Sequence, residues 1–289
     1  MKRTIKYILI GIVLIFSIII ILGGGFGDRK DYKLINQGKP IVFAHRGYVN
    51  LNVENSIESF SKSDSIGFIA IETDISCTND GKLIIFHDKS AKRLLGINAN
   101  IDELKWSDIN QKYLIYNGEQ TTNKVLSLNE FLKQTDSSKI LYLDIKKATK
   151  SIADSLLSIL EKNNKHKNII IADDNLLFLV YLKIKAPNIR IALEGFNKGK
   201  EWIYYIIPTN YKPDYYSSFL SEVDENHIKF LKKHKIINNK ITYGVDVNNI
   251  NIALDFGIQN IILDYDTSIG SIKILEEKML KNIPNRITN

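Results

Sequence analysis

From residue 40 onward, short apolar runs alternate with segments in which apolar residues recur at helical spacing. The apolar runs are of the type found in strands buried within a sheet. We predict strands at 41–44, 71–75, 83–88, 140–143, 168–172, 189–193, 215–219, 241–245 and 260–264. We predict helices at 57–66, from 128 onward, and at 149–163, 174–185, 199–207, 223–235, 249–256 and 271–281. The long polar segment 89–126 is expected to be a loop with one short helix.

Strands that alternate with helices predict parallel βα units, and we expect an α/β fold of the (β/α)8 TIM-barrel type. A closed barrel needs eight strands, and the pattern has nine. Asn79-Asp80-Gly81 is a turn signal, so strand 83–88 is expected to fold back antiparallel and to be the extra one, unless one of the C-terminal strands is absent. A doubly wound sheet is the alternative, but it needs a Gly-rich phosphate turn after the first strand, which His45-Arg46-Gly47 is not.

The first 27 residues predict one transmembrane helix before the barrel. Residues 7–27 carry no charge and are long enough to cross a hydrocarbon core of about 30 Å. Basic residues precede this run and Asp28 follows it, so the bulk of the chain is expected outside the cell membrane. The expected order is an anchor at 1–27, a linker at 28–39 and the barrel at 40–289. A cleaved signal peptide, which gives a secreted protein, is the alternative.

Composition excludes several classes of protein. The net charge of +7 is spread thinly over 289 residues, and no motif or basic run indicates nucleic-acid binding. Cys77 is the only cysteine, which excludes an intramolecular disulfide and a thiolate zinc site. An exported protein without disulfides is typical of bacteria. The sequence does not identify a protein partner.

Polar side chains follow three successive predicted strands. Glu72 and Asp74 are two residues apart and therefore share one face of a strand, and the turn at 79–81 brings His87 roughly opposite Glu72. The carboxyl ends of barrel strands are where active sites lie. The full set of candidates is His45, Arg46, Glu72, Asp74, His87, Asp144 and Lys146.

These residue types favour phosphoryl chemistry. The three carboxylates offer hard oxygen ligands, which suit Ca²⁺ or Mg²⁺. Both histidines are then free for proton transfer, and Arg46 and Lys146 supply positive charge for an anionic substrate. Each residue also has a structural interpretation, in which the histidines are hydrogen-bonded and the carboxylates form salt bridges with the two cations.

The same positions resemble the motifs of the glycerophosphodiester phosphodiesterase family. That family has HRG, E-N, E-x-D, T-x-D-G, H-D and E-x-K motifs in this order. This chain has His45-Arg46-Gly47, Glu54-Asn55, Glu72-Thr73-Asp74, Thr78-Asn79-Asp80-Gly81, His87-Asp88 and Asp144-Ile145-Lys146. Near the C-terminus, Thr242-Tyr243-Gly244-Val245-Asp246 and Ile261-Ile262-Leu263-Asp264-Tyr265 are similar to its V-W-T-V-N and I-I-T-D-Y strands.

The resemblance implies a metal-dependent hydrolysis that releases an alcohol and glycerol 3-phosphate from a glycerophosphodiester. It implies that His45 and His87 are the general acid and base, and that Arg46 and Lys146 bind the phosphate. It implies that Ca²⁺ or Mg²⁺ is held by the carboxylates Glu72, Asp74 and Asp144.

Three positions depart from the family pattern: Val53 replaces Pro, Asp144 replaces Glu and Tyr243 replaces Trp. An Asp in place of that Glu also occurs in related sphingomyelinase D-type phospholipases. A phospholipase D-like activity on lysolipids or sphingomyelin-type lipids is therefore an alternative, and a non-catalytic barrel that binds a polyanion is another. The aromatic-rich segment 202–219 is expected to pack in the core, with a choline-binding or membrane-contacting role as the alternative.

Overall fold

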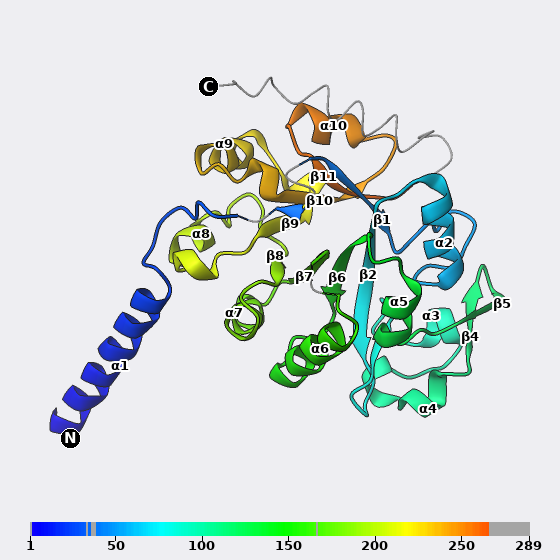
Figure 1. Cartoon of the computed structure of the whole chain (residues 1–289), viewed down its shortest axis with the longest axis horizontal. Helices are drawn as coiled ribbons and strands as arrows, with labels where there is room; N and C mark the ends of the chain where they lie inside the picture. Colours follow the sequence, from blue (N-terminus) through cyan, green and yellow to red (C-terminus); the bar gives the residue numbers. More distant parts are fainter. Residues whose placement is uncertain (1, 33, 36–38, 166, 266–289) are drawn as a thin grey trace.

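The computed structural model describes residues 2–32, 34–35, 39–165 and 167–265. Eight parallel strands close into a barrel, because β1 pairs with β11 on one side and with β2 on the other (Figure 1). The barrel strands are β1 (Ile41–His45), β2 (Ala70–Cys77), β6 (Ile140–Ile145), β7 (Ile169–Asp173), β8 (Arg190–Leu193), β9 (Tyr215–Phe219), β10 (Lys240–Val245) and β11 (Asn260–Leu263). The predicted barrel is confirmed, and the doubly wound alternative is wrong, because an open sheet has no pairing between its two edges.

The ninth strand, β3 (Leu83–Ile85), pairs antiparallel with the end of β2. The turn at 79–81 therefore forms as predicted. β3 lies at the edge of the sheet and also forms an isolated bridge to Ser127, while β6 pairs with the other edge of β2 from Ala70 to Ile75. The hairpin extends the β2 strand beyond the rim of the barrel.

Helices follow most barrel strands and surround them (Figure 1). They are α2 (Ile57–Ile66), α5 (Leu128–Gln134), α6 (Lys150–Lys162), α7 (Leu176–Lys185), α8 (Trp202–Ile206), α9 (Glu225–Lys233) and α10 (Ile250–Asp255). Short 3₁₀ turns occur at η3 (Thr209–Tyr211), η4 (Leu220–Glu222) and η5 (Ile237–Asn239). The helix predicted at 271–281 lies outside the described residues.

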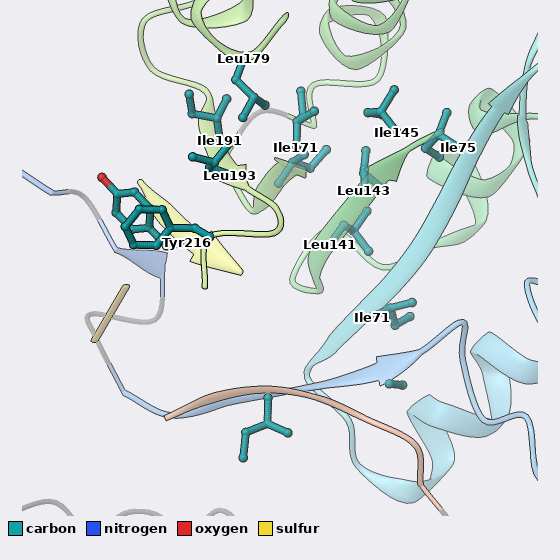
Figure 2. Packing of buried hydrophobic residues seen from close by; sticks show 14 of the residues in the cluster. Ile71, Ile75, Leu141, Leu143, Ile145, Ile171, Leu179, Ile191, Leu193 and Tyr216 are labelled. Carbon is teal, nitrogen blue, oxygen red and sulfur yellow. The ribbon is translucent and has the colours of Figure 1, made fainter. Parts of the chain in front are cut away.

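Alternate residues of the strands face two separate cores. On β6, Leu141 and Leu143 face the helices and pack in a cluster that includes Leu179 (Figure 2). Ile140 and Tyr142 face the barrel axis, where they pack with Phe43 and others. Because side chains alternate along a strand, residue 144 continues the inward row that passes through Tyr142. A polar residue at that position therefore points into the mouth of the barrel.

The segment after β3 has more structure than predicted. It contains α3 (Lys92–Leu95), η2 (Ile101–Glu103), α4 (Trp106–Ile109) and a hairpin of β4 (Tyr113–Tyr116) with β5 (Glu119–Lys124). The turn of this hairpin is Asn117-Gly118, and both residues have positive φ. That dipeptide is a strong hairpin signal which our prediction of a loop overlooked. The segment packs around its own small core, which includes Ile84 and Leu114.

At the N-terminus, α1 (Lys2–Leu22) precedes the barrel. Among the residues that the structure describes, no helix has the length and apolar character needed to cross a membrane. The transmembrane helix predicted over 7–27 is therefore not supported by the structure.

The segment predicted as a linker contacts the barrel through buried ion pairs. The Arg29 guanidinium donates to Asp214 at 2.9 Å, and the Lys183 ammonium donates to the same carboxylate at 2.6 Å. Asp214 is 1% exposed and immediately precedes β9, so these contacts lie at the end of the barrel opposite the carboxyl ends of the strands. Arg29 of this polar segment therefore makes a specific contact with the barrel.

We expect Asp214→Ala to lower the free energy of unfolding by about 3–5 kcal/mol, because it removes the carboxylate that pairs with buried Lys183 and the buried one of the two carboxylates that pair with Arg29. Asp31→Ala is the matched control. Asp31 pairs with the same Arg29 at 3.1 Å, but its side chain is 80% exposed, so the loss should stay below about 1 kcal/mol. Urea unfolding curves of the two variants measure the difference, and equal losses would contradict this account.

Candidate functional site

A cavity of about 320 Å³ opens at the carboxyl ends of the barrel strands. All seven residues singled out in the sequence line it. They come from β1, β2, β6 and the segments that follow these strands and β3: His45, Arg46, Glu72, Asp74, His87, Asp144 and Lys146. The structure therefore brings the predicted set together, while the role of each residue stays a prediction. Tyr142, Glu194, Phe219, Tyr243 and Asp264 also line the cavity.

Three carboxylates meet at the floor of this cavity. Glu72 and Asp74 point inward from β2, and Asp144 is the parallel-sheet partner of Asp74 on β6. One oxygen from each of the three lies within 4.8 Å of the others. Glu72 and Asp74 are buried. Carboxylates so close together in a buried place repel one another unless positive charge is present.

Two cations supply part of that charge. The Lys146 ammonium lies 2.8 Å from Asp74 Oδ1 and 2.5 Å from Asp144 Oδ2. The Arg46 guanidinium lies 3.2 Å from Asp74 Oδ2 and donates to Glu54 at 3.0 Å. Both residues were predicted to bind phosphate, and in the structure both pair with carboxylates.

The two cations compensate the charges of the three carboxylates unevenly, as the pKa values of Glu72, Asp74 and Asp144 show. Burial acts to raise the pKa of Asp74, but Lys146 and Arg46 outweigh it and hold that pKa below its usual value. Burial and the neighbouring Asp74 raise the pKa of Glu72 to about 8. Burial also raises the pKa of Asp144, against the opposing effect of Lys146. The site therefore lacks positive charge around Glu72 and Asp144, and an oxygen-only donor set fits a hard divalent cation.

The chain after β1 is bent sharply to bring Arg46 over the carboxylates. Arg46 and Gly47 have φ values of 53° and 83°. A Cβ on Gly47 would lie 2.5 Å from Ser59 Oγ and 2.7 Å from the Ser59 carbonyl carbon, so only glycine fits. Asn55, also at positive φ, donates to Asp74 Oδ2 at 2.8 Å. The backbone conformation of this turn thus explains the glycine of the HRG motif and the asparagine of the E-N motif.

His45 is held between two carboxylates. Its Nδ1 lies 2.5 Å from Asp264 Oδ1, and its Nε2 lies 3.9 Å from Glu72 Oε2. Burial acts to lower the pKa of His45, but the hydrogen bond that its Nδ1 makes to the Asp264 carboxylate and the charge of Glu72 outweigh burial and raise it. Asp264 was not among the predicted site residues, although its place at the carboxyl end of the last predicted strand, 260–264, could have identified it.

His87 has a separate acidic partner. Its Nδ1 lies 2.9 Å from Asp88 Oδ1, and Asp88 accepts a hydrogen bond from Arg93 at 2.6 Å. The hydrogen bond from Arg93 is the main cause that lowers the pKa of Asp88 to about 2. Glu54, His87 and Asp88 are also close enough to hold a metal, but the Arg93 guanidinium donates to both Glu54 and Asp88 and already supplies the positive charge there.

Glu194 is a further acid in the cavity, and the sequence analysis missed it. It accepts a hydrogen bond from the Tyr142 hydroxyl at 2.8 Å, and burial together with Asp144 raises its pKa to about 8. Like Asp264, it directly follows a barrel strand, and that position was the available signal.

An aromatic pair forms the opposite wall. The rings of Phe219 and Tyr243 meet edge to face with centroids 4.4 Å apart. Only part of the segment 202–219 packs in the core as expected: Tyr204, Tyr215 and Tyr216 are buried, whereas Trp202 and Tyr205 are exposed. Phe219 departs from that expectation because it lines the cavity.

Comparison with known proteins agrees with this geometry. The sequence profile of the glycerophosphoryl diester phosphodiesterase family matches residues 45–265. A glycerophosphodiester phosphodiesterase of Caldanaerobacter subterraneus is 27% identical over 165 residues, which are 54% of this chain and 66% of that protein. A human lysophospholipase D is 35% identical over 103 residues, 32% of this chain and 33% of that protein. The chain thus matches a third to two thirds of the length of these relatives.

Solved structures share the fold over a longer stretch. A phosphodiesterase of Oleispira antarctica, solved with the product sn-glycerol-3-phosphate, has a TM-score of 0.70 at 18% identity and covers 80% of this chain and 95% of its own. A glycerophosphodiester phosphodiesterase of Thermotoga maritima has a TM-score of 0.61 at 23% identity, covering 78% of this chain and 94% of its own. At these identities the likeness shows a common fold.

The raised pKa of Glu72 predicts how stability depends on pH without metal. The folded chain keeps this carboxyl protonated up to about pH 8, whereas the unfolded chain releases the proton near the ordinary glutamate pKa of 4.5. The folded state therefore binds more protons in this window, and this group's contribution to stability is lost as pH rises towards 8. Urea unfolding in chelator at pH 5.5 and pH 8 should show a smaller loss in Glu72→Gln than in wild type.

Glu161→Gln, at an exposed position on α6, is the control and should keep the wild-type pH dependence. If Glu72→Gln keeps it as well, the Glu72 carboxyl does not hold a proton in the metal-free site.

Proposed function

The chain belongs to the glycerophosphoryl diester phosphodiesterase family, and on that premise we propose that it hydrolyses glycerophosphodiesters to an alcohol and glycerol 3-phosphate with the help of a divalent cation. The observation that carries the proposal is the meeting of three carboxylates with two histidines at one cavity. The product bound in the Oleispira structure supports the choice of substrate class.

Glu72, Asp74 and Asp144 would hold the cation, which we propose to be Ca²⁺ or Mg²⁺. Their oxygens are close enough together, and the raised pKa values of Glu72 and Asp144 mark a deficit of positive charge. When bound, the cation would offset charge on the phosphate and orient the glycerol hydroxyls. A ligand phosphate would also draw Arg46 and Lys146 towards it, since both side chains line the same cavity.

The histidines are proposed to move the protons. A glycerol hydroxyl beside the phosphoester attacks phosphorus while one histidine accepts its proton, and the other protonates the departing alcohol oxygen. Water then opens the resulting cyclic phosphate, with the two histidines in exchanged roles, to give glycerol 3-phosphate. Asp264 and Asp88 each bond the Nδ1 of one histidine, which fixes the ring and leaves Nε2 for proton transfer.

The place of catalysis is proposed from the sequence alone. Basic residues before the apolar N-terminal run and Asp28 after it favour a catalytic domain outside a bacterial cell, at the outer face of the membrane or secreted after cleavage.

A second candidate activity is the release of an alcohol from lysolipids. The aromatic wall of Phe219 and Tyr243 supports it, because such rings bind quaternary ammonium head groups. The similarity to a human lysophospholipase D points the same way. The products distinguish the two activities: glycerophosphocholine gives glycerol 3-phosphate, whereas a lysolipid gives a lipid phosphate.

We expect His45→Ala and His87→Ala each to lower kcat on glycerophosphocholine by about 10²–10⁴-fold, because each removes a proton-transfer group. Release of glycerol 3-phosphate measures the rate. His234→Gln is the matched control. His234 hydrogen-bonds Asp28 and caps the C-terminal end of α9, so it lies at the end of the barrel opposite the cavity. Wild-type rates in either alanine variant would remove that histidine from the mechanism.

A further inference from the structure

A second cavity of about 440 Å³ lies beside the active site, next to the β2–β3 hairpin. His87 and Lys146 line both cavities, so the two are joined at these side chains. Cys77 at the end of β2 and Ile101 of η2 form apolar parts of the second cavity. A substrate bound with its phosphorus over the carboxylates would reach the second cavity if it extended past His87.

The charges in the second cavity are mostly positive. Lys89, Lys146 and Lys147 line it, against the single carboxylate of Asp102. The charge of Lys146 is taken up by the catalytic carboxylates. Lys147 pairs with Asp102 at 3.2 Å, and both side chains are more than a third exposed, so this pair is weak and open to exchange.

Lys89 is the cation without a counter-charge here. It is exposed, and the part of the chain that the structure describes contains no ion pair to its ammonium group. Its backbone carbonyl accepts a hydrogen bond from the Ile101 amide at 2.8 Å, which fixes the residue at the edge of the cavity. The cavity therefore presents an unpaired ammonium group and a second, weakly paired one, held on different segments.

Lys146 and Lys147 are neighbours in the sequence but have different partners. Both lie in the bend that follows β6, and their ammonium groups pair with different carboxylates. Lys146 reaches the carboxylates, and Lys147 reaches Asp102 of η2. Lys146 lies at the carboxylates over which the reacting phosphorus is proposed to bind, whereas Lys147 lines the second cavity.

We propose that the second cavity is an anion-binding subsite, in which Lys89 and Lys147 bind a phosphate group carried by the alcohol part of the substrate. This inference rests on the proposed phosphodiesterase activity, because it specifies which alcohol is released. The phosphate can be a monoester on a small alcohol or the next diester of a glycerol phosphate chain. Both present the same anionic oxygens to the two ammonium groups.

The test compares three substrates that share the same scissile bond. The first is glycerophosphoglycerol, the second carries a terminal phosphate on the released glycerol, and the third continues through a diester to a further glycerol. In wild type, the second and third should have a lower KM than the first, and this advantage should shrink in high salt. A lower KM for the second identifies a monoester ligand, and a lower KM for the third identifies a chain; either supports the subsite.

Lys89→Ala and Lys147→Ala should each raise KM about three- to tenfold for the two phosphate-bearing substrates, the range for one hydrogen bond of ordinary net strength at an exposed site. Neither should change turnover of glycerophosphoglycerol. Asp102→Asn should lower KM for the phosphate-bearing substrates, because it frees Lys147. Lys92→Ala, an exposed lysine on α3 outside the cavity, is the matched control and should leave every KM unchanged.

A purely structural role for the lysines predicts equal effects on all three substrates, and that result would overturn the inference. Turnover of all three substrates with the same KM in wild type would overturn it too, while leaving the proposed phosphodiesterase intact. If none of the three is turned over, the proposed function fails and this inference fails with it.

Discussion

Repulsion between three closely spaced carboxylates, two of them buried, is the constraint on which the rest of the site depends. Glu72, Asp74 and Asp144 bring their oxygens within 4.8 Å of one another at the end of two paired strands. Such an arrangement is costly unless cations share the space. Lys146 and Arg46 meet part of the need, mainly at Asp74. The charge that is still missing around Glu72 is what makes the cavity a metal site in our account.

The backbone conformation after β1 places the Arg46 cation beside the carboxylates. Arg46 reaches Asp74 only because the chain turns through positive φ at Arg46 and Gly47, where a larger residue than glycine would strike Ser59. Each histidine has a carboxylate partner of its own outside the cluster of Glu72, Asp74 and Asp144. His87 is tied through Asp88 to Arg93, whereas His45 is tied to Asp264 on the far side of β1. The two imidazoles thus have different electrostatic surroundings at one cavity, as acid–base partners require.

Much of the barrel was predictable because its strands are buried on both faces and appear as apolar runs. The antiparallel β3 was predictable from the turn residues that precede it. The β4–β5 hairpin was missed because β4 is only four residues long and β5 is polar and largely exposed, so that Asn117-Gly118 is its clearest signal. The contact of Arg29 with Asp214 could not be foreseen, because it joins residues 185 positions apart. Within the site, the motif residues were found from their spacing. Glu194 and Asp264 were missed because each stands alone at a strand end, and only closure of the barrel brings them to the cavity.

The most direct test of the account is the metal requirement of the reaction. The full chain is stripped with chelator, and the conversion of glycerophosphocholine to glycerol 3-phosphate is followed by phosphorus NMR while Ca²⁺ or Mg²⁺ is added back. We predict no turnover in the stripped protein and full recovery at one ion bound per chain. Equal turnover before and after stripping would contradict the assignment of Glu72, Asp74 and Asp144 as metal ligands.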